Sequence, residues 1–175
     1  MALWSSAVVF VMLRGHLSWP LFLLAGLAAL HADGSLGESW LRAGAIASAV
    51  ALVVAAGVHV YWASGGRWVL DRALPTGRRS GRVFAPGRRL TLTVAGAFLA
   101  FAALIIAVVE GRGPGALRWL VGAGVGVLAL RAMGDTKVAG FTKTVRDTPF
   151  ALADDRWFTP LVVFLAFGAV GALTV

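Results

Sequence analysis

Long apolar blocks dominate the chain, and they alternate with short segments that are polar, glycine-rich or strongly basic. The blocks lack the periods of 2 or 3.6 residues that are typical of half-buried strands and of surface helices. An α-helix rises about 1.5 Å per residue, and the hydrocarbon core of a membrane is about 30 Å thick. Blocks of this length therefore predict membrane-spanning helices. We expect spans at residues 3–30, 40–62, 90–109, 119–133 and 160–175.

The first apolar segment has two interpretations. Residues 3–30 can form one long helix that is tilted in the membrane or kinked near Pro20. Alternatively, Arg14 and the apolar run that follows it resemble a signal peptide or signal anchor. Leu30 stands where cleavage after Ala32 would require a small residue, which favours an uncleaved span. The predicted fold class is an all-α polytopic transmembrane helix bundle with five spans, or four if the first segment is a cleaved signal.

We expect the chain to have two parts. Residues 1–39 form the first transmembrane segment and its polar link, and residues 40–175 form a four-helix membrane domain. Within that domain, residues 63–89 and 134–158 are predicted to be loops at the inner face, because they are rich in charge, glycine and proline. The second loop is too polar to span. It should fold back into the membrane interface, with a bend at Gly140.

Two threonine–proline pairs predict helix starts in the last third of the chain. Thr148 followed by Pro149 indicates the start of a short helix over residues 150–154. Thr159 is the predicted N-cap of the last span, and Pro160 lies in its first turn. A short interfacial helix followed by a separate span is therefore expected.

The composition agrees with a membrane protein and excludes several kinds of chemistry. Hydrophobic residues make up 59% and charged residues 14% of the 175 residues, with a mean hydropathy of +0.83. A soluble domain carries about 25% charged residues. The chain has no cysteine, which excludes disulfides, thiolate metal sites and iron–sulfur clusters. Three histidines offer little for a zinc or haem site, so no metal and no cofactor are expected.

The basic residues predict how the chain is oriented. With the amino terminus in the cytoplasm, the inner loops hold 11 of the 16 basic residues and the outer links hold three. This distribution follows the positive-inside rule. We therefore expect a multi-pass protein of the bacterial inner (plasma) membrane, whose net charge of +8 faces anionic lipid rather than nucleic acid. The inner basic residues are Arg67, Arg72, Arg78, Arg79, Arg82, Arg88, Arg89, Lys137, Lys143, Arg146 and Arg156.

Two motifs meet at this predicted inner face. The first is HVYWASGGRW at the end of the second span, where His59 and Trp62 share a helix face because they are three residues apart. The second occupies residues 131–160, where Arg131 and Asp135 are four residues apart and are predicted to pair along the helix. The candidate ligand-binding residues are His59, Tyr61, Trp62, Trp68, Arg131, Asp135, Lys143, Asp154 and Asp155.

Each candidate also has a purely structural interpretation. His59 can serve as a packing residue near the membrane interface, and Arg131 with Asp135 can close the bundle. Asp154 and Asp155 are adjacent and are predicted to point apart, so they do not suggest a paired acid–base site. One of these aspartates is expected to cap a helix or to pair with Lys143 or Arg146. The sequence has no nucleophile–base motif and no nucleotide-binding motif, which leaves catalysis undecided.

At these motifs the chain resembles an uncharacterised bacterial membrane family, domain of unknown function 3995. The matching residues are His59, Tyr61, Trp62, Gly65, Gly66, Trp68, Arg131, Gly134, Asp135, Gly140, Phe141, Lys143, Phe150, Ala151, Asp154, Pro160 and Leu161. The resemblance covers residues 40–175 and implies four helices, with the first span as an addition. It implies no activity. Asp154 and Asp155 both fit the single aspartate of the family pattern.

Three functions are compatible with the sequence. The leading hypothesis is a site for an amphiphilic or anionic small molecule or lipid at the cytoplasmic interface, built from His59, Trp62, Arg131, Asp135 and Lys143. The alternative is a structural or assembly subunit that packs through small-residue helix faces against a partner helix or a second copy. A weaker alternative is an enzyme or carrier that acts on a lipid or quinone, with the histidine as proton donor.

Overall fold

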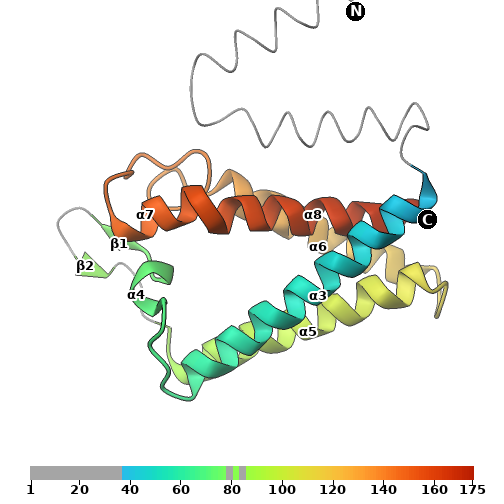
Figure 1. The fold of residues 1–175 in the computed structure, drawn as a ribbon, viewed down its shortest axis with the longest axis horizontal. Helices are drawn as coiled ribbons and strands as arrows, with labels where there is room; N and C mark the ends of the chain where they lie inside the picture. The colour runs from blue at the N-terminus through green and yellow to red at the C-terminus, as the bar shows by residue number, and fades with distance from the viewer. Residues whose placement is uncertain (1–36, 78–80, 83–85) are drawn as a thin grey trace, which may run out of the picture. The chain divides into compact units, whose positions relative to one another are not determined.

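The computed structural model describes residues 37–77, 81–82 and 86–175 (Figure 1). The predicted first span at residues 3–30 lies outside the described part of the chain. Residues Glu38–Val175 form one compact unit. Its elements are α3 (Glu38–Ala63), α4 (Leu70–Ala73), β1 (Thr76–Gly77), β2 (Gly81–Arg82), α5 (Arg88–Val109), α6 (Ala116–Met133), α7 (Pro149–Ala153), the π-helical turn η1 (Asp154–Phe158) and α8 (Thr159–Thr174).

Four helices in the described part of the chain are long and apolar enough to cross a membrane. They are α3, α5, α6 and a continuous helix over Pro149–Thr174 that comprises α7, η1 and α8. This confirms a helical multi-span fold, and the middle three spans begin within three residues of their predicted starts. The two-residue strands β1 and β2 pair in an antiparallel hairpin that was not predicted.

The predicted start of the last span at Pro160 is wrong. The helix begins at Pro149, which confirms the predicted helix start at Thr148 and Pro149. The Thr148 hydroxyl accepts a hydrogen bond from the Ala151 N–H at 3.1 Å and so caps the helix. Thr159 has helical backbone angles and caps nothing. Its N–H bonds to the Asp154 carbonyl, five residues back, so the helix is wider just before Pro160. We infer that this wider turn accommodates the proline ring, which would clash with a carbonyl in a regular α-helix.

Small residues set the closest helix contacts. Helix α3 packs against α5 and α8, and α8 also packs against α6. A Cβ added to Gly168 of α8 would overlap Ser48 of α3, and one added to Gly171 would lie 2.9 Å from the Leu41 carbonyl oxygen. The Ser48 hydroxyl donates to the Phe164 carbonyl across this interface, at 3.3 Å. Small residues on both helices therefore permit the close approach of α3 and α8.

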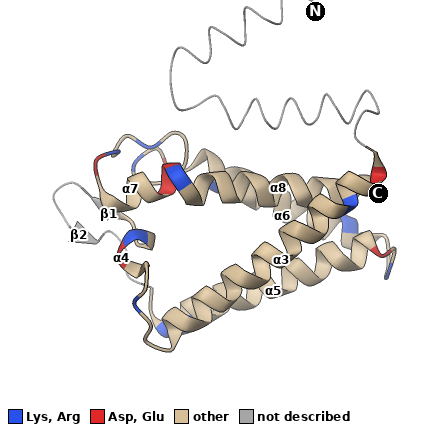
Figure 2. Ribbon diagram, viewed as in Figure 1, with Lys and Arg blue, Asp and Glu red and all other residues tan. Residues whose placement is uncertain are grey.

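Helices α3 and α6 end, and α5 and α7 begin, at one end of the bundle, which we call the loop end (Figure 1). The α3–α5 and α6–α8 pairs diverge toward it, and α4 with the hairpin lies between them (Figure 1). Helix α4 packs against α7 there. Both sequence motifs lie at the loop end, and basic residues of α4 and η1 are visible there in Figure 2.

Candidate functional site

His59 lies in an aromatic contact between α3 and α5. Its ring centroid is 5.0 Å from that of Trp62 and 5.2 Å from that of Phe98 on α5. The predicted shared face of His59 and Trp62 is confirmed. The Nδ1 atom of His59 lies 2.8 Å from the Ala55 carbonyl oxygen. Because a carbonyl only accepts, Nδ1 carries the hydrogen, and in the neutral ring Nε2 is left as the acceptor.

The two glycines of the first motif turn the chain back over the end of α3. Gly65 has φ +102°, a left-handed value that favours glycine. Gly66 lies on the Tyr61 ring so closely that an added Cβ would overlap it. The Trp62 indole Nε1–H then donates to the Trp68 carbonyl at 2.9 Å. The motif therefore builds a fixed turn that presents the Trp68 side chain, which is 69% exposed.

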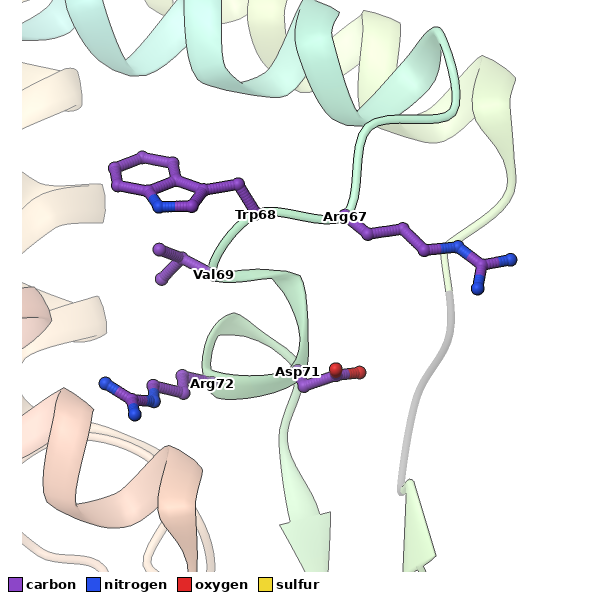
Figure 3. A pocket seen from close by; sticks show the side chains of 5 residues that line it. All are labelled: Arg67, Trp68, Val69, Asp71 and Arg72. Carbon is purple, nitrogen blue, oxygen red and sulfur yellow. The ribbon is translucent and has the colours of Figure 1, made fainter.

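A pocket of about 340 Å³ lies at this turn and at the start of α4 (Figure 3). Its lining residues are Arg67, Trp68, Val69, Asp71 and Arg72. Trp68, Val69 and Arg72 point to one side of the turn, whereas Arg67 and Asp71 point to the other (Figure 3). The β-branched Val69 has φ +61°, which is an unfavourable conformation. Among these residues, sequence reasoning singled out Trp68 alone, although the basic loop that supplies the arginines was recognised.

The second motif converges on Asp154, whose side chain is completely buried. Its Oδ1 accepts from Arg131 Nη2 at 2.6 Å, and its Oδ2 accepts from Lys143 Nζ at 2.9 Å and from the Gly140 N–H at 2.8 Å. The predicted Arg131–Asp135 pair is wrong, because α6 ends at Met133 and the next residue turns the chain away from the helix axis. Arg131 instead reaches across to the last helix.

Asp135 stabilises the loop backbone. Its Oδ1 accepts from the backbone N–H groups of Lys137, Val138 and Ala139 at 3.0, 2.7 and 2.9 Å. Partial burial acts to raise the pKa of Asp135, but these three donors favour the charged form and hold the pKa below its usual range. The Asp135 carboxylate is thus bound to backbone N–H groups of its own loop.

Gly134 and Gly140 bring two stretches of this loop into backbone contact. Both have positive φ, +92° and +76°. A Cβ on Gly134 would overlap the Ala139 carbonyl, and one on Gly140 would lie 2.6 Å from the Ala132 carbonyl oxygen. The expected bend at Gly140 is confirmed. We call this segment, in which the Gly134 and Gly140 stretches cross, the crossing loop. The crossing also directs the Gly140 N–H at Asp154.

Lys143 is a fully buried cation whose donors are satisfied. Its Nζ bonds to Asp154, to Asp155 Oδ1 at 2.5 Å and to the Gly140 carbonyl at 3.2 Å. Pairing of an aspartate with Lys143 or Arg146 was predicted and is confirmed, with Arg146 Nη1 lying 3.6 Å from Asp155 Oδ2. The prediction that the two aspartates point apart is wrong, because both reach the one ammonium group. Asp154 is the buried member, and the Asp155 side chain is 40% exposed.

The described contacts thus divide the predicted site residues into two groups at the loop end. The aromatic group lies at the end of α3 and in the turn after it, and consists of His59, Tyr61, Trp62 and Trp68. The charged group lies at the end of α6, in the loop that joins α6 to α7 and in η1, and consists of Arg131, Asp135, Lys143, Asp154 and Asp155. One ligand that contacts both groups stays a prediction. Within residues 37–77, 81–82 and 86–175, no cluster of three or more His, Asp or Glu side chains has a geometry that could hold a metal ion.

Four apolar helices of spanning length, joined by polar loops, are the pattern of a multi-pass helical membrane protein. The chain belongs to the family described as "Protein of unknown function (DUF3995)", whose model matches residues 51–169. The matched range contains the turn after α3 and the whole Asp154 network. The expected family relationship is therefore confirmed. No curated protein and no solved structure matches the chain.

Proposed function

We propose that this protein binds an anionic amphiphile, such as a lipid with an acidic headgroup, at the inner face of the membrane. The acidic group lies beside Arg72, and the apolar part lies against Trp68. The observation that carries the proposal is that Trp68 is held by its backbone and yet remains 69% exposed, on the same side of the pocket as Arg72 (Figure 3). An indole at the membrane interface combines an apolar surface with a polar edge.

The dimensions of the pocket suit a headgroup better than a whole lipid. Ligand pockets range from about 300 to 1,000 Å³, and this one is at the lower limit with about 340 Å³. A guanidinium can bind an acidic oxygen pair with two parallel hydrogen bonds, which favours phosphate or carboxylate. The acyl chains would remain in the surrounding bilayer, which the helices are long and apolar enough to cross.

The inner-face location rests on the distribution of basic residues. Arg67 and Arg72 lie at the loop end, as do Arg88 and Arg89 at the start of α5. Such a concentration of positive charge is typical of cytoplasmic loops and attracts anionic lipids of that leaflet. The same charge would raise the local concentration of an acidic ligand around the pocket.

Native mass spectrometry of the protein in detergent tests this proposal. A defined acidic lipid, phosphatidylglycerol, is titrated against wild type, Arg72→Gln and Trp68→Ala. We expect a stoichiometric adduct with wild type and binding weakened at least about tenfold in both variants. Arg72→Gln removes a charged hydrogen bond that contributes about 1.5–3 kcal/mol, and Trp68→Ala removes the apolar surface of the indole. The matched control is Arg88→Gln, which removes the same charge from the start of α5, at the loop end but outside the pocket, and should retain binding.

Equal binding by wild type and both pocket variants would contradict the proposed site. Equal loss in Arg72→Gln and Arg88→Gln would show that net charge alone attracts the lipid. A zwitterionic lipid of the same chain length, titrated in parallel, distinguishes recognition of the acid group from general lipid association. In the proposed site it should bind more weakly to wild type, because its own cation competes with Arg72 for the phosphate, and it should lose less affinity than phosphatidylglycerol in Arg72→Gln.

A structural role through α6 is the second candidate function. A Cβ added to Gly122 or Gly126 would meet nothing within 4 Å, so this face of α6 is not packed against any described residue. Pairs of small residues four apart permit close approach of another transmembrane helix. Gly122→Leu with Gly126→Leu should then abolish a detergent-stable complex. The same monomeric mass for wild type and the double variant would reject this role.

A further inference from the structure

The wide turn η1 leaves a buried hydroxyl without a partner. Thr159 is 1% exposed, and its Oγ1 has no hydrogen-bond partner among the described residues. Other helical threonines in this chain do not share this state: the hydroxyl groups of Thr91, Thr93 and Thr174 each donate to a backbone carbonyl of the preceding turn. A buried polar group that lacks a partner costs free energy, which makes it a signal of an additional acceptor.

A second buried donor without a partner belongs to Arg131. Its Nη2 bonds to Asp154 Oδ1, whereas its Nη1 is buried and has no partner among the described residues. Asp154 already accepts three hydrogen bonds through its two oxygens. A carboxylate can accept about four hydrogen bonds, but none of those that Asp154 accepts comes from Arg131 Nη1.

Both unmet donors belong to residues in direct contact with Asp154. Arg131 contacts its carboxylate, and the Thr159 N–H bonds to its backbone carbonyl. Thr159 follows Asp154 by five residues, which is the spacing of the π-helical hydrogen bond between their backbones. Helix α8 packs against α6, which carries Arg131. The topology thus places a charged donor and a neutral donor around the same buried aspartate.

We propose that Arg131 Nη1 and the Thr159 hydroxyl together bind a small monovalent anion of the chloride type. A halide accepts several hydrogen bonds and donates none, which suits a site made of two donors. A water molecule in the same place would bring two hydrogens that need acceptors, and Asp154 has room for about one further hydrogen bond. The site is separate from the Trp68–Arg72 pocket and does not depend on the function proposed there.

Thermal unfolding in detergent tests the site with chloride as the probe. Wild type is titrated with sodium chloride against sodium gluconate at constant ionic strength, so that charge screening is equal in both series. We expect a saturable rise of Tm with chloride, as for any ligand that binds only the folded state. Thr159→Val should weaken the apparent chloride affinity at least about tenfold, because it removes one donor to an anion.

Two variants separate the anion site from general damage to the fold. Thr91→Val removes another buried threonine hydroxyl, one that already has a backbone partner, and should keep the chloride response. Thr159→Ser keeps the hydroxyl and should also keep the chloride response. This variant remains informative if Thr159→Val fails to fold. Absence of a chloride effect in wild type, or an undiminished effect in Thr159→Val, would overturn the proposal.

Crystals of wild type grown with bromide provide an independent test. An anomalous bromide peak within hydrogen-bond distance of Arg131 Nη1 and Thr159 Oγ1 is the expected result. Bromide found only at surface arginines, with a water or nothing between these two groups, would show that the unmet donors do not bind an anion. Phosphatidylglycerol binding by the Thr159→Val variant should be unchanged, since the lipid pocket lies elsewhere.

Discussion

Lys143 and Asp154 form a completely buried ion pair, with Nζ 2.9 Å from Oδ2 and no exposed side-chain surface on either residue. The pair joins the loop after α6 to the start of the last helix. A buried charge is tolerated only when partners satisfy it, and here Lys143 bonds to three acceptors while Asp154 accepts from three donors. The pair therefore identifies this loop as an ordered part of the fold.

Removal of the lysine alone should be strongly destabilising. Lys143→Met removes the fully buried cation and leaves Asp154 with Arg131 and Gly140 as donors. Breaking one side of a buried pair costs about 3–5 kcal/mol, and we expect the lower end because Arg131 remains. We expect a lower Tm in detergent and a larger fraction of aggregate in size-exclusion chromatography. Lys137→Met, in the same loop but exposed, is the control and should behave like wild type.

The double variant Lys143→Met with Asp154→Leu tests the reason for that loss. Replacement of both charges by apolar groups removes the buried carboxylate that has lost its lysine, while Arg131, whose side chain is 35% exposed, can turn to solvent. The double variant should therefore recover part of the stability lost by Lys143→Met alone. Full additivity of the two single effects would show that the residues act independently and would contradict the buried pair.

The glycines of the crossing loop should not tolerate a methyl group. In Gly140→Ala the alanine would have to adopt a positive φ, and its Cβ would lie against backbone atoms of Ala132 and Gly134. The free energy of unfolding is therefore expected to fall by at least about 2 kcal/mol. Gly96→Ala is the matched control, since its Cβ would meet nothing within 4 Å inside helix α5. That control should be neutral or stabilising by about 0.5–1 kcal/mol. Thermal unfolding of both variants distinguishes these outcomes.

Asp135 should make stability depend on pH in the acidic range. Its pKa is lower in the folded protein than the unfolded value of about 3.9. The full contribution of Asp135 to the free energy of unfolding is therefore present when the pH is above the unfolded pKa. The contribution is lost as the pH falls through the folded pKa, because the three loop N–H donors then face a protonated group. Asp135→Asn keeps an acceptor oxygen that does not titrate.

The measurement is the difference in Tm between wild type and Asp135→Asn from pH 6 to pH 3. This difference should favour wild type at pH 6 and shrink toward pH 3, since only the wild-type residue becomes protonated. A constant difference across the range would mean that Asp135 does not titrate with folding. The effect should be small, because the side chain is exposed to solvent.

Trp62→Phe should loosen the turn that presents Trp68. The substitution keeps an aromatic ring beside His59 but removes the Nε1–H that donates to the Trp68 carbonyl. A loss of about 1 kcal/mol is expected for one hydrogen bond. Phosphatidylglycerol binding should weaken too if the pocket needs a fixed Trp68. Unchanged lipid affinity in a folded Trp62→Phe protein would show that the turn is held by other contacts.

The sequence alone determined the class of protein and the position of its middle spans. A membrane helix needs a long apolar block and little else, so α3, α5 and α6 are visible as blocks. The shared face of His59 and Trp62 follows from helix periodicity, and Thr148 with Pro149 is a local capping signal. The family relationship, too, could be inferred from the motifs.

Only the tertiary structure decided the partners of the charged residues. Arg131 has Asp135 as its near neighbour in sequence but pairs with Asp154, which is 23 residues away. Sequence spacing predicts contacts only while a helix continues, and the turn at Gly134 ends that relation. The start of the last helix and the pocket at Trp68 were likewise not predictable. They depend on a π-helical turn before Pro160 and on side-chain directions in an irregular loop, neither of which has a local sequence signal.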